Sequence, residues 1–108
     1  MSGSPAAVVV YVTCSAPAQA EAIARHLIWE RLAACANLIP GMRSLYRWQG
    51  ALESAEETVL ILKTTAGRVP ALTERVKQLH TYTVPCVVAV PVVDGSPEYL
   101  AWIAAETA

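Results

Sequence analysis

Three side chains suited to holding a soft metal ion occur along the chain: Cys14, His80 and Cys86. Thiolates and neutral imidazoles are ligands that Cu(I) and Zn(II) prefer, whereas harder ions prefer carboxylates. Cys14 also stands just before an expected helix start, where the pKa of a thiol is lowered and the thiolate is favoured. These residue types predict a metal site, provided that the fold brings them together.

Each of these residues also has a simpler interpretation. Free cysteine packs well as a small hydrophobe, so core packing or a redox pair also explains Cys14 and Cys86, and packing explains Cys35. His80 closes an expected helix, where a histidine can cap the last carbonyls. A nucleophilic pair of Cys14 and His80 is a further alternative. Because the chain contains neither H-E-x-x-H nor G-x-S-x-G, we expect no enzyme.

The elements that must position this cluster follow from hydrophobic periodicity, which alternates between a strand pattern and a helix pattern. Turn residues, prolines and a serine cap separate the segments. The expected order is a strand over 8–13, a helix over 17–34, a strand over 37–48 with a bulge at Pro40-Gly41, a turn at Gln49-Gly50, a strand over 58–64, a helix over 69–79, a strand over 86–92 and a short helix over 97–106 capped by Ser96.

This order predicts an α+β fold of the ferredoxin-like βαββαβ type, an antiparallel sheet with two helices on one face and a short C-terminal helix. We expect one domain over residues 1–108, with residues 1–5 flexible. The first and last strands are antiparallel neighbours in this fold, so Cys14, His80 and Cys86 should meet at one end of the sheet. Cys35 should lie at the far end of the first helix, roughly 27 Å away.

Composition indicates an oligomer. Hydrophobic residues make up 55% of the chain, charged residues only 16%, and the mean hydropathy is +0.39. Because Val59 and Ile61 alternate with Leu60 and Leu62, both faces of that strand are apolar, and we expect its open face to meet another subunit.

The charge, the apolar runs and the cysteines of the chain argue against several other functions and cellular locations. The net charge of −1 and scattered basic residues argue against nucleic-acid binding. The longest apolar runs are too short to cross a membrane. Three cysteines without framework spacing and an N-terminus without a basic region predict a cytoplasmic protein. An RNA-recognition module shares the element order, but the chain has no Phe and no basic-aromatic strand.

Four separated blocks of the chain carry a resemblance to a known family. The blocks are Glu30 to Gly41, Ser44 to Gly50, Leu62 to Thr65, and Val90-Pro91-Val92 leading to Asp94 to Leu100. In order and spacing they resemble the CutA family of divalent-cation tolerance proteins. The resemblance implies a ferredoxin-like homotrimer formed by pairing of the long hairpin strands, with bound copper or another divalent cation and a role in metal tolerance. It also implies that Tyr46, Trp48 and Lys63 surround an intersubunit cleft; sheet packing for the aromatics and a snorkelling amine for the lysine are the alternatives.

The chain departs from the family pattern at the expected metal site. The family commonly has His-Pro-Tyr, two further residues and Pro-Glu, whereas this chain has His80-Thr81-Tyr82-Thr83-Val84-Pro85-Cys86. The resemblance carries Cys14 and His80 over as ligands, and Cys86 replaces a carboxylate. The site is then either softer or has lost its metal. In the second case, the expected function is that of a PII-like trimeric small-molecule sensor or signalling scaffold.

Overall fold

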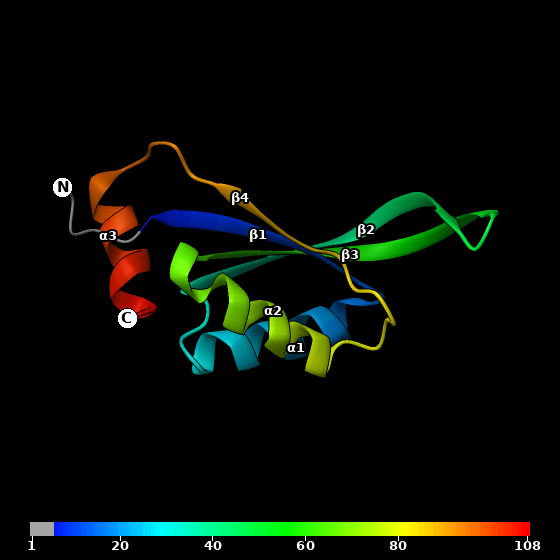
Figure 1. The fold of residues 1–108 in the computed structure, drawn as a ribbon, viewed down its shortest axis with the longest axis horizontal. Coiled ribbons are helices and arrows are strands. Elements are labelled where there is room, and N and C mark those ends of the chain that lie inside the picture. Colours follow the sequence, from blue (N-terminus) through cyan, green and yellow to red (C-terminus); the bar gives the residue numbers. More distant parts are fainter. Residues whose placement is uncertain (1–5) are drawn as a thin grey trace.

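The computed structural model describes residues 6–108, so the expectation of flexibility at residues 1–5 lies outside the described residues. Four antiparallel strands form one sheet in the order β2-β3-β1-β4, and α1 and α2 cover one of its faces (Figure 1). The predicted α+β order is confirmed. The elements are β1 (Ala7–Cys14), α1 (Pro17–Trp29), β2 (Cys35–Trp48), β3 (Ala51–Thr65), the 3-10 helix η1 (Ala66–Arg68), α2 (Val69–Leu79), β4 (Val87–Pro91) and α3 (Pro97–Glu106).

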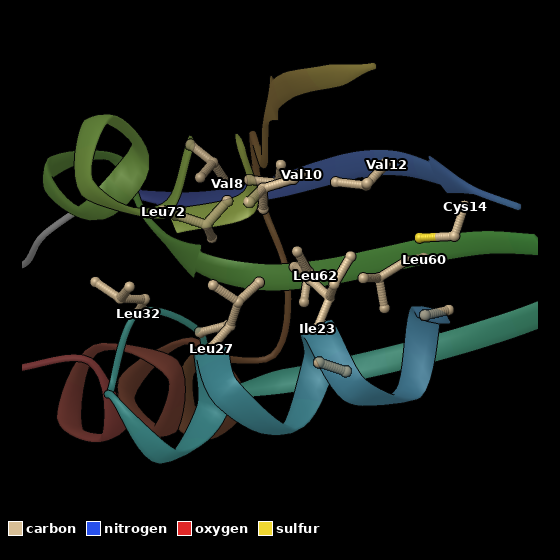
Figure 2. Close-up of a cluster of buried hydrophobic side chains, with 14 residues drawn as sticks. Val8, Val10, Val12, Cys14, Ile23, Leu27, Leu32, Leu60, Leu62 and Leu72 are labelled. Atoms are coloured by element: carbon tan, nitrogen blue, oxygen red, sulfur yellow. The ribbon is translucent and has the colours of Figure 1, made fainter. Parts of the chain in front are cut away.

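The alternation of β1 decides which of its side chains reach the core. Successive side chains of a strand point to opposite faces of the sheet. Val8, Val10, Val12 and Cys14 are buried against the helices, whereas the residues between them are only half-buried on the open face. Figure 2 shows these four side chains above Ile23 and Leu27 of α1. Cys14 is therefore the last member of the core-facing row.

The first helix ends earlier than the sequence predicts, because α1 stops at Trp29 rather than near Ala34. Arg31 adopts a left-handed conformation with φ of 60°, and the N–H of Leu32 donates to the carbonyl of Leu27 at 2.8 Å. This is a Schellman motif, completed by packing of Leu32 and Leu27 in the same core cluster. Cys35 consequently opens β2 and does not lie on a helix.

Strands β2 and β3 form the long hairpin that the sequence predicts, but β3 begins at Ala51 rather than at residue 58, because residues 51–57 pair with β2 despite their low content of β-branched residues. A register shift between Ile39 and Met42 marks the bulge, where Gly41 has a φ of 78°. At the tip, Gln49 and Gly50 have φ values of 50° and 83°, as a two-residue type I′ turn requires. The tip projects beyond the rest of the sheet (Figure 1).

Two further elements were also correctly predicted. α2 spans Val69–Leu79, so that His80 is the first residue after it. Ser96 caps α3, since its hydroxyl accepts a hydrogen bond from the N–H of Tyr99 at 3.5 Å. No helix within residues 6–108 is long and apolar enough to span a membrane.

The open face of the sheet is incompletely covered in the single chain. Val59 is buried there, but Val88 and Val90 of the edge strand β4 are 53% and 51% exposed. On the other face of the projecting hairpin, Leu45 and Leu52 are 66% and 80% exposed. These side chains provide apolar surface on which the expected oligomer could be built.

Candidate functional site

A cleft of about 450 Å³ lies at the end of the sheet where β1 finishes. Its walls come from β1, the hairpin and the loop that joins α2 to β4. The polar groups that line it include Thr13, Glu57 and Cys86, and three aromatic residues, Tyr46, Trp48 and Tyr82, supply much of the remaining wall. Clefts of this size typically bind small molecules.

The strand register places Cys14 and Cys86 on opposite faces of the sheet. β1 and β4 are antiparallel neighbours up to the pair Val12 and Val87, and Thr13 and Cys86 are the residues that directly adjoin this pair. Both of these residues line the cleft. Cys14 follows Thr13 and points into the core (Figure 2). The two thiols share one end of the sheet, as expected, but the sheet itself separates them.

The environment of Cys14 reverses the predicted effect on its acidity. The thiol is fully buried, and burial raises its pKa to about 11, with a further contribution from the negative charge of Glu57. The expectation of a lowered pKa was wrong, because the side chain packs among apolar groups, where the charged form is disfavoured.

His80 uses both of its ring nitrogens within the chain. Nδ1 accepts a hydrogen bond from the N–H of Tyr82 at 3.1 Å, so the proton of the neutral ring belongs on Nε2, which donates to the carbonyl of Thr13 at 2.8 Å. The ring also lies 4.4 Å, centroid to centroid, from the ring of Tyr82. His80 thus ties the loop after α2 to the end of β1, and neither nitrogen has a lone pair available for a metal ion in this arrangement.

No group of three or more His, Cys, Asp and Glu side chains within residues 6–108 is arranged to hold a metal ion. A site shared by Cys14, His80 and Cys86 would require the imidazole to leave its two partners and Cys14 to turn out of the core. The metal site implied by the resemblance therefore stays a prediction, and of its three residues only Cys86 lines the cleft.

Glu57 is the functional candidate that the sequence did not reveal. Its side chain is only 8% exposed, and Oε2 accepts a hydrogen bond from the hydroxyl of Tyr82 at 2.7 Å. None of the ion pairs formed within the described chain includes it. In the sequence it is one of two adjacent glutamates, and only the register with β2, which sets it opposite Met42, shows that it faces the cleft.

The carboxylate of Glu57 shapes the acidity of its neighbours. The pKa of the Cys86 thiol is raised by partial burial and then by the charge of Glu57. The pKa of Tyr82 is raised by burial and then by its hydrogen bond to Glu57. Both groups therefore stay protonated at neutral pH, and Glu57 makes the cleft a region of negative potential.

Tyr46, Trp48 and Lys63 do not meet within one chain. Tyr46 and Trp48 line the cleft, but Lys63 stands opposite Val9 at the other end of the sheet. Its ammonium lies 5.5 Å from the centre of the Tyr99 ring on α3. A site that includes all three requires a second subunit, so this prediction concerns an assembly and stays open.

The chain is similar over most of its length to proteins described as CutA. Residues 8–106 match the family described as CutA1 divalent ion tolerance protein. The divalent-cation tolerance protein CutA of Thermus thermophilus is 48% identical over 99 residues, which cover 92% of this chain and 96% of that one. Protein CutA of Mus musculus is 46% identical over 93 residues, and the match spans 52% of the mouse protein.

Solved structures agree with the sequence comparison. The divalent cation tolerance protein Cut A1 of Thermus thermophilus superposes with a TM-score of 0.93 at 47% identity, covering 94% of this chain and 99% of that one. CutA1 of Oryza sativa gives a TM-score of 0.95 at 40% identity, covering 99% and 98% of the two chains. Sequence and fold together show that the chain belongs to the CutA1 divalent ion tolerance family.

Proposed function

We propose that the protein is a non-enzymatic metal-ion-binding protein of metal tolerance, acting as a cytoplasmic homotrimer that binds copper or another divalent cation. The observation that carries the proposal is the position of Glu57 and Cys86 in one cleft, a carboxylate and a thiol on the same face of the sheet. The names of the bacterial relatives, divalent-cation tolerance proteins, supply the physiological context.

A metal ion at this position would take Cys86 as thiolate and Glu57 as carboxylate, with water or a neighbouring subunit completing the ligand set. A thiolate ligand favours soft or borderline ions such as Cu(I) and Zn(II). Because the pKa of Cys86 is raised, the metal must displace a proton from the thiol, so affinity should rise with pH. Cys14 and His80, which the resemblance also implicates, would join only after leaving their present contacts.

Trimer formation is supported by the apolar side chains on the projecting hairpin and on β4. Leu52 at the hairpin and Val90 on the edge strand are 80% and 51% exposed, and oligomers commonly bury such groups. A reducing compartment is supported by the three cysteines, all of which are free thiols. Size-exclusion chromatography with light scattering tests the trimer directly: a monodisperse monomer would contradict it.

Metal titration of the reduced protein tests the ligand assignment. We expect Zn²⁺ affinity to fall about tenfold or more in Cys86→Ala and in Glu57→Gln, because each loses a direct ligand. Cys35→Ala is the matched control, since Cys35 opens β2 far from the cleft and should leave affinity unchanged. Equal stoichiometry and affinity in all variants would reject the assignment.

The size of the cleft favours a second candidate function, that of a PII-like trimeric small-molecule sensor without a physiological metal. A volume of about 450 Å³ far exceeds what one metal ion fills and falls within the usual range for small ligands. A thermal-shift screen of metabolites against metal-free protein tests this function. A screen in which only metals raise the melting temperature would remove it.

A further inference from the structure

Trp29, the last residue of α1, is the most exposed tryptophan of the chain. It is 88% exposed, whereas Trp48 and Trp102 are 45% and 42% exposed. Tryptophan is highly buried on average, because its side chain carries about 150–250 Å² of largely apolar surface. Ile28, the preceding residue, is 41% exposed, so the end of α1 presents two large apolar side chains to solvent.

This surface lies on the other side of the molecule from the groups assigned to trimer formation. α1 belongs to the helix layer that covers one face of the sheet, whereas those groups lie on the open face and on the hairpin (Figure 1). The end of α1 lies beside α3, since Arg31 donates to the carbonyl of Ala105 at 2.9 Å, and the hairpin projects from the opposite end (Figure 1). A neighbour on the open face therefore has the sheet between itself and Trp29.

Two hollows of unlike charge flank Trp29. One, of about 670 Å³, extends along α1 and is lined by Arg25 and His26. The other, of about 260 Å³, lies between the end of α1 and α3 and is lined by Arg31 and Glu106. Arg31 already donates to carbonyls at the end of α3, and Glu106 belongs to none of the ion pairs of the described chain. The first flank is therefore basic and the second carries a free carboxylate.

Because the indole and its two unlike flanks belong to one surface, that surface is complementary to itself. A two-fold axis that lies along the surface beside Trp29 brings two indoles together and sets the basic flank of each copy against the acidic flank of the other. Arg25 pairs with Glu21 at 2.7 Å, yet its side chain is 77% exposed and its guanidinium has donors left for Glu106. A partner of one charge would be repelled by one of the flanks, whereas a second copy matches both.

We propose that this surface is a contact between two copies of the protein, with Trp29 against Trp29 and Arg25 against Glu106. The contact goes beyond the proposed function and needs no metal ion. One indole buries at most about 250 Å² per copy, far below the roughly 800 Å² per partner of a stable interface, so the association is weak and depends on concentration. A trimer carries three such surfaces, so trimers joined in this way form larger particles.

Sedimentation velocity of metal-free protein in EDTA, from about 10 µM to about 1 mM, is the measurement. We call the species present at the lowest concentration the basic assembly. The parent protein should show a larger species that grows with concentration, and Trp29→Glu should remove it while leaving the basic assembly intact. Ala18→Glu is the matched control, because it adds the same charge at an exposed position of the same helix, about 16 Å away along the axis, and should behave as the parent does.

An exchange of charges tests the two-fold arrangement. Arg25→Glu and Glu106→Arg should each weaken the association about fivefold at low salt, because like charges then face each other across the contact. The double variant should restore the association, since the two charges again match. Circular dichroism confirms that each variant keeps the fold.

A single species at all concentrations of the parent protein would overturn the proposal. A double variant that associates no better than the single variants would also overturn it, as would a larger species that persists in Trp29→Glu. Loss of the basic assembly in Trp29→Glu would place Trp29 in the trimer interface and contradict a separate contact. If the basic assembly is a monomer, the proposed trimer falls, but a dimer that Trp29→Glu removes still supports the contact.

Discussion

Alkaline pH should destabilise the folded chain through the single thiol of Cys14. In the fold its pKa is raised from an ordinary value of 9.0 to about 11, because the side chain is fully buried and, to a smaller extent, because the negative charge of Glu57 is nearby. Between these two values the unfolded chain releases the proton while the folded chain retains it. The stabilising contribution is complete below pH 9 and is lost as the pH rises toward 11.

The size of the effect follows from the shift. Two pKa units correspond to about 3 kcal/mol of folding free energy, and this is the most stability that Cys14 alone can remove. Other groups also titrate in this window, among them Tyr82, whose pKa is raised as well. The total loss in the parent protein should therefore exceed the part due to Cys14.

Comparison with Cys14→Val isolates the thiol, because valine is similar in size, apolar and unable to ionise. Free energies of unfolding from guanidinium chloride titrations in reductant at pH 8, 9.5 and 11 provide the measurement. The stability of the parent relative to the variant should fall by about 2 to 3 kcal/mol over this range. Parallel pH profiles for the two proteins would refute the reasoning, since they would mean that Cys14 is not held in an apolar environment.

Three further outcomes are expected. Iodoacetamide at pH 8 should modify the half-buried Cys35 and Cys86 in the folded protein well before Cys14, as peptide mass spectrometry would show; equal rates would contradict the burial of Cys14. Arg31→Gly should change the free energy of unfolding by less than about 1 kcal/mol, whereas Arg31→Val should lower it by about 1 kcal/mol or more, because a β-branched residue is strained at a φ of 60°; denaturant titration distinguishes the two. Tyr82→Phe should lower stability at pH 7 by about 1 to 2 kcal/mol, because the carboxylate of Glu57 loses its donor; no change in a melting experiment would mean that water replaces the phenol without cost.

Most of the fold follows from sequence patterns, and the misplaced end of the first helix has a local cause. The period-two and period-3.6 segments, the Gln49-Gly50 turn and the Ser96 cap all carry recognisable residue types, and the structure has each of them. The end of α1 was misplaced because its left-handed position is occupied by arginine, where glycine is usual. In the sequence, Leu32 fits the spacing of the apolar residues of this helix. In the structure it follows the helix, and its side chain packs in the same core cluster as Leu27.

The candidate site was harder to predict, because it depends on side-chain direction rather than on chain order. The predicted topology correctly placed the end of β1 beside the start of β4. It could not show that Cys14 and Cys86 occupy opposite faces, since a shift of one residue in either strand reverses every side chain. Glu57 was missed for the same reason: the pair Glu56-Glu57 has one exposed and one buried member, and only cross-strand pairing distinguishes them.

The separation of Cys14 from Cys86 by the sheet has an evolutionary consequence. A mutation at position 86 alters the lining of the cleft, but it is not in the cluster of buried side chains that holds the helices in place. The ligand preference of the cleft can thus change during evolution with little loss of folding stability. Relatives with one common scaffold are then free to recognise chemically unlike ligands.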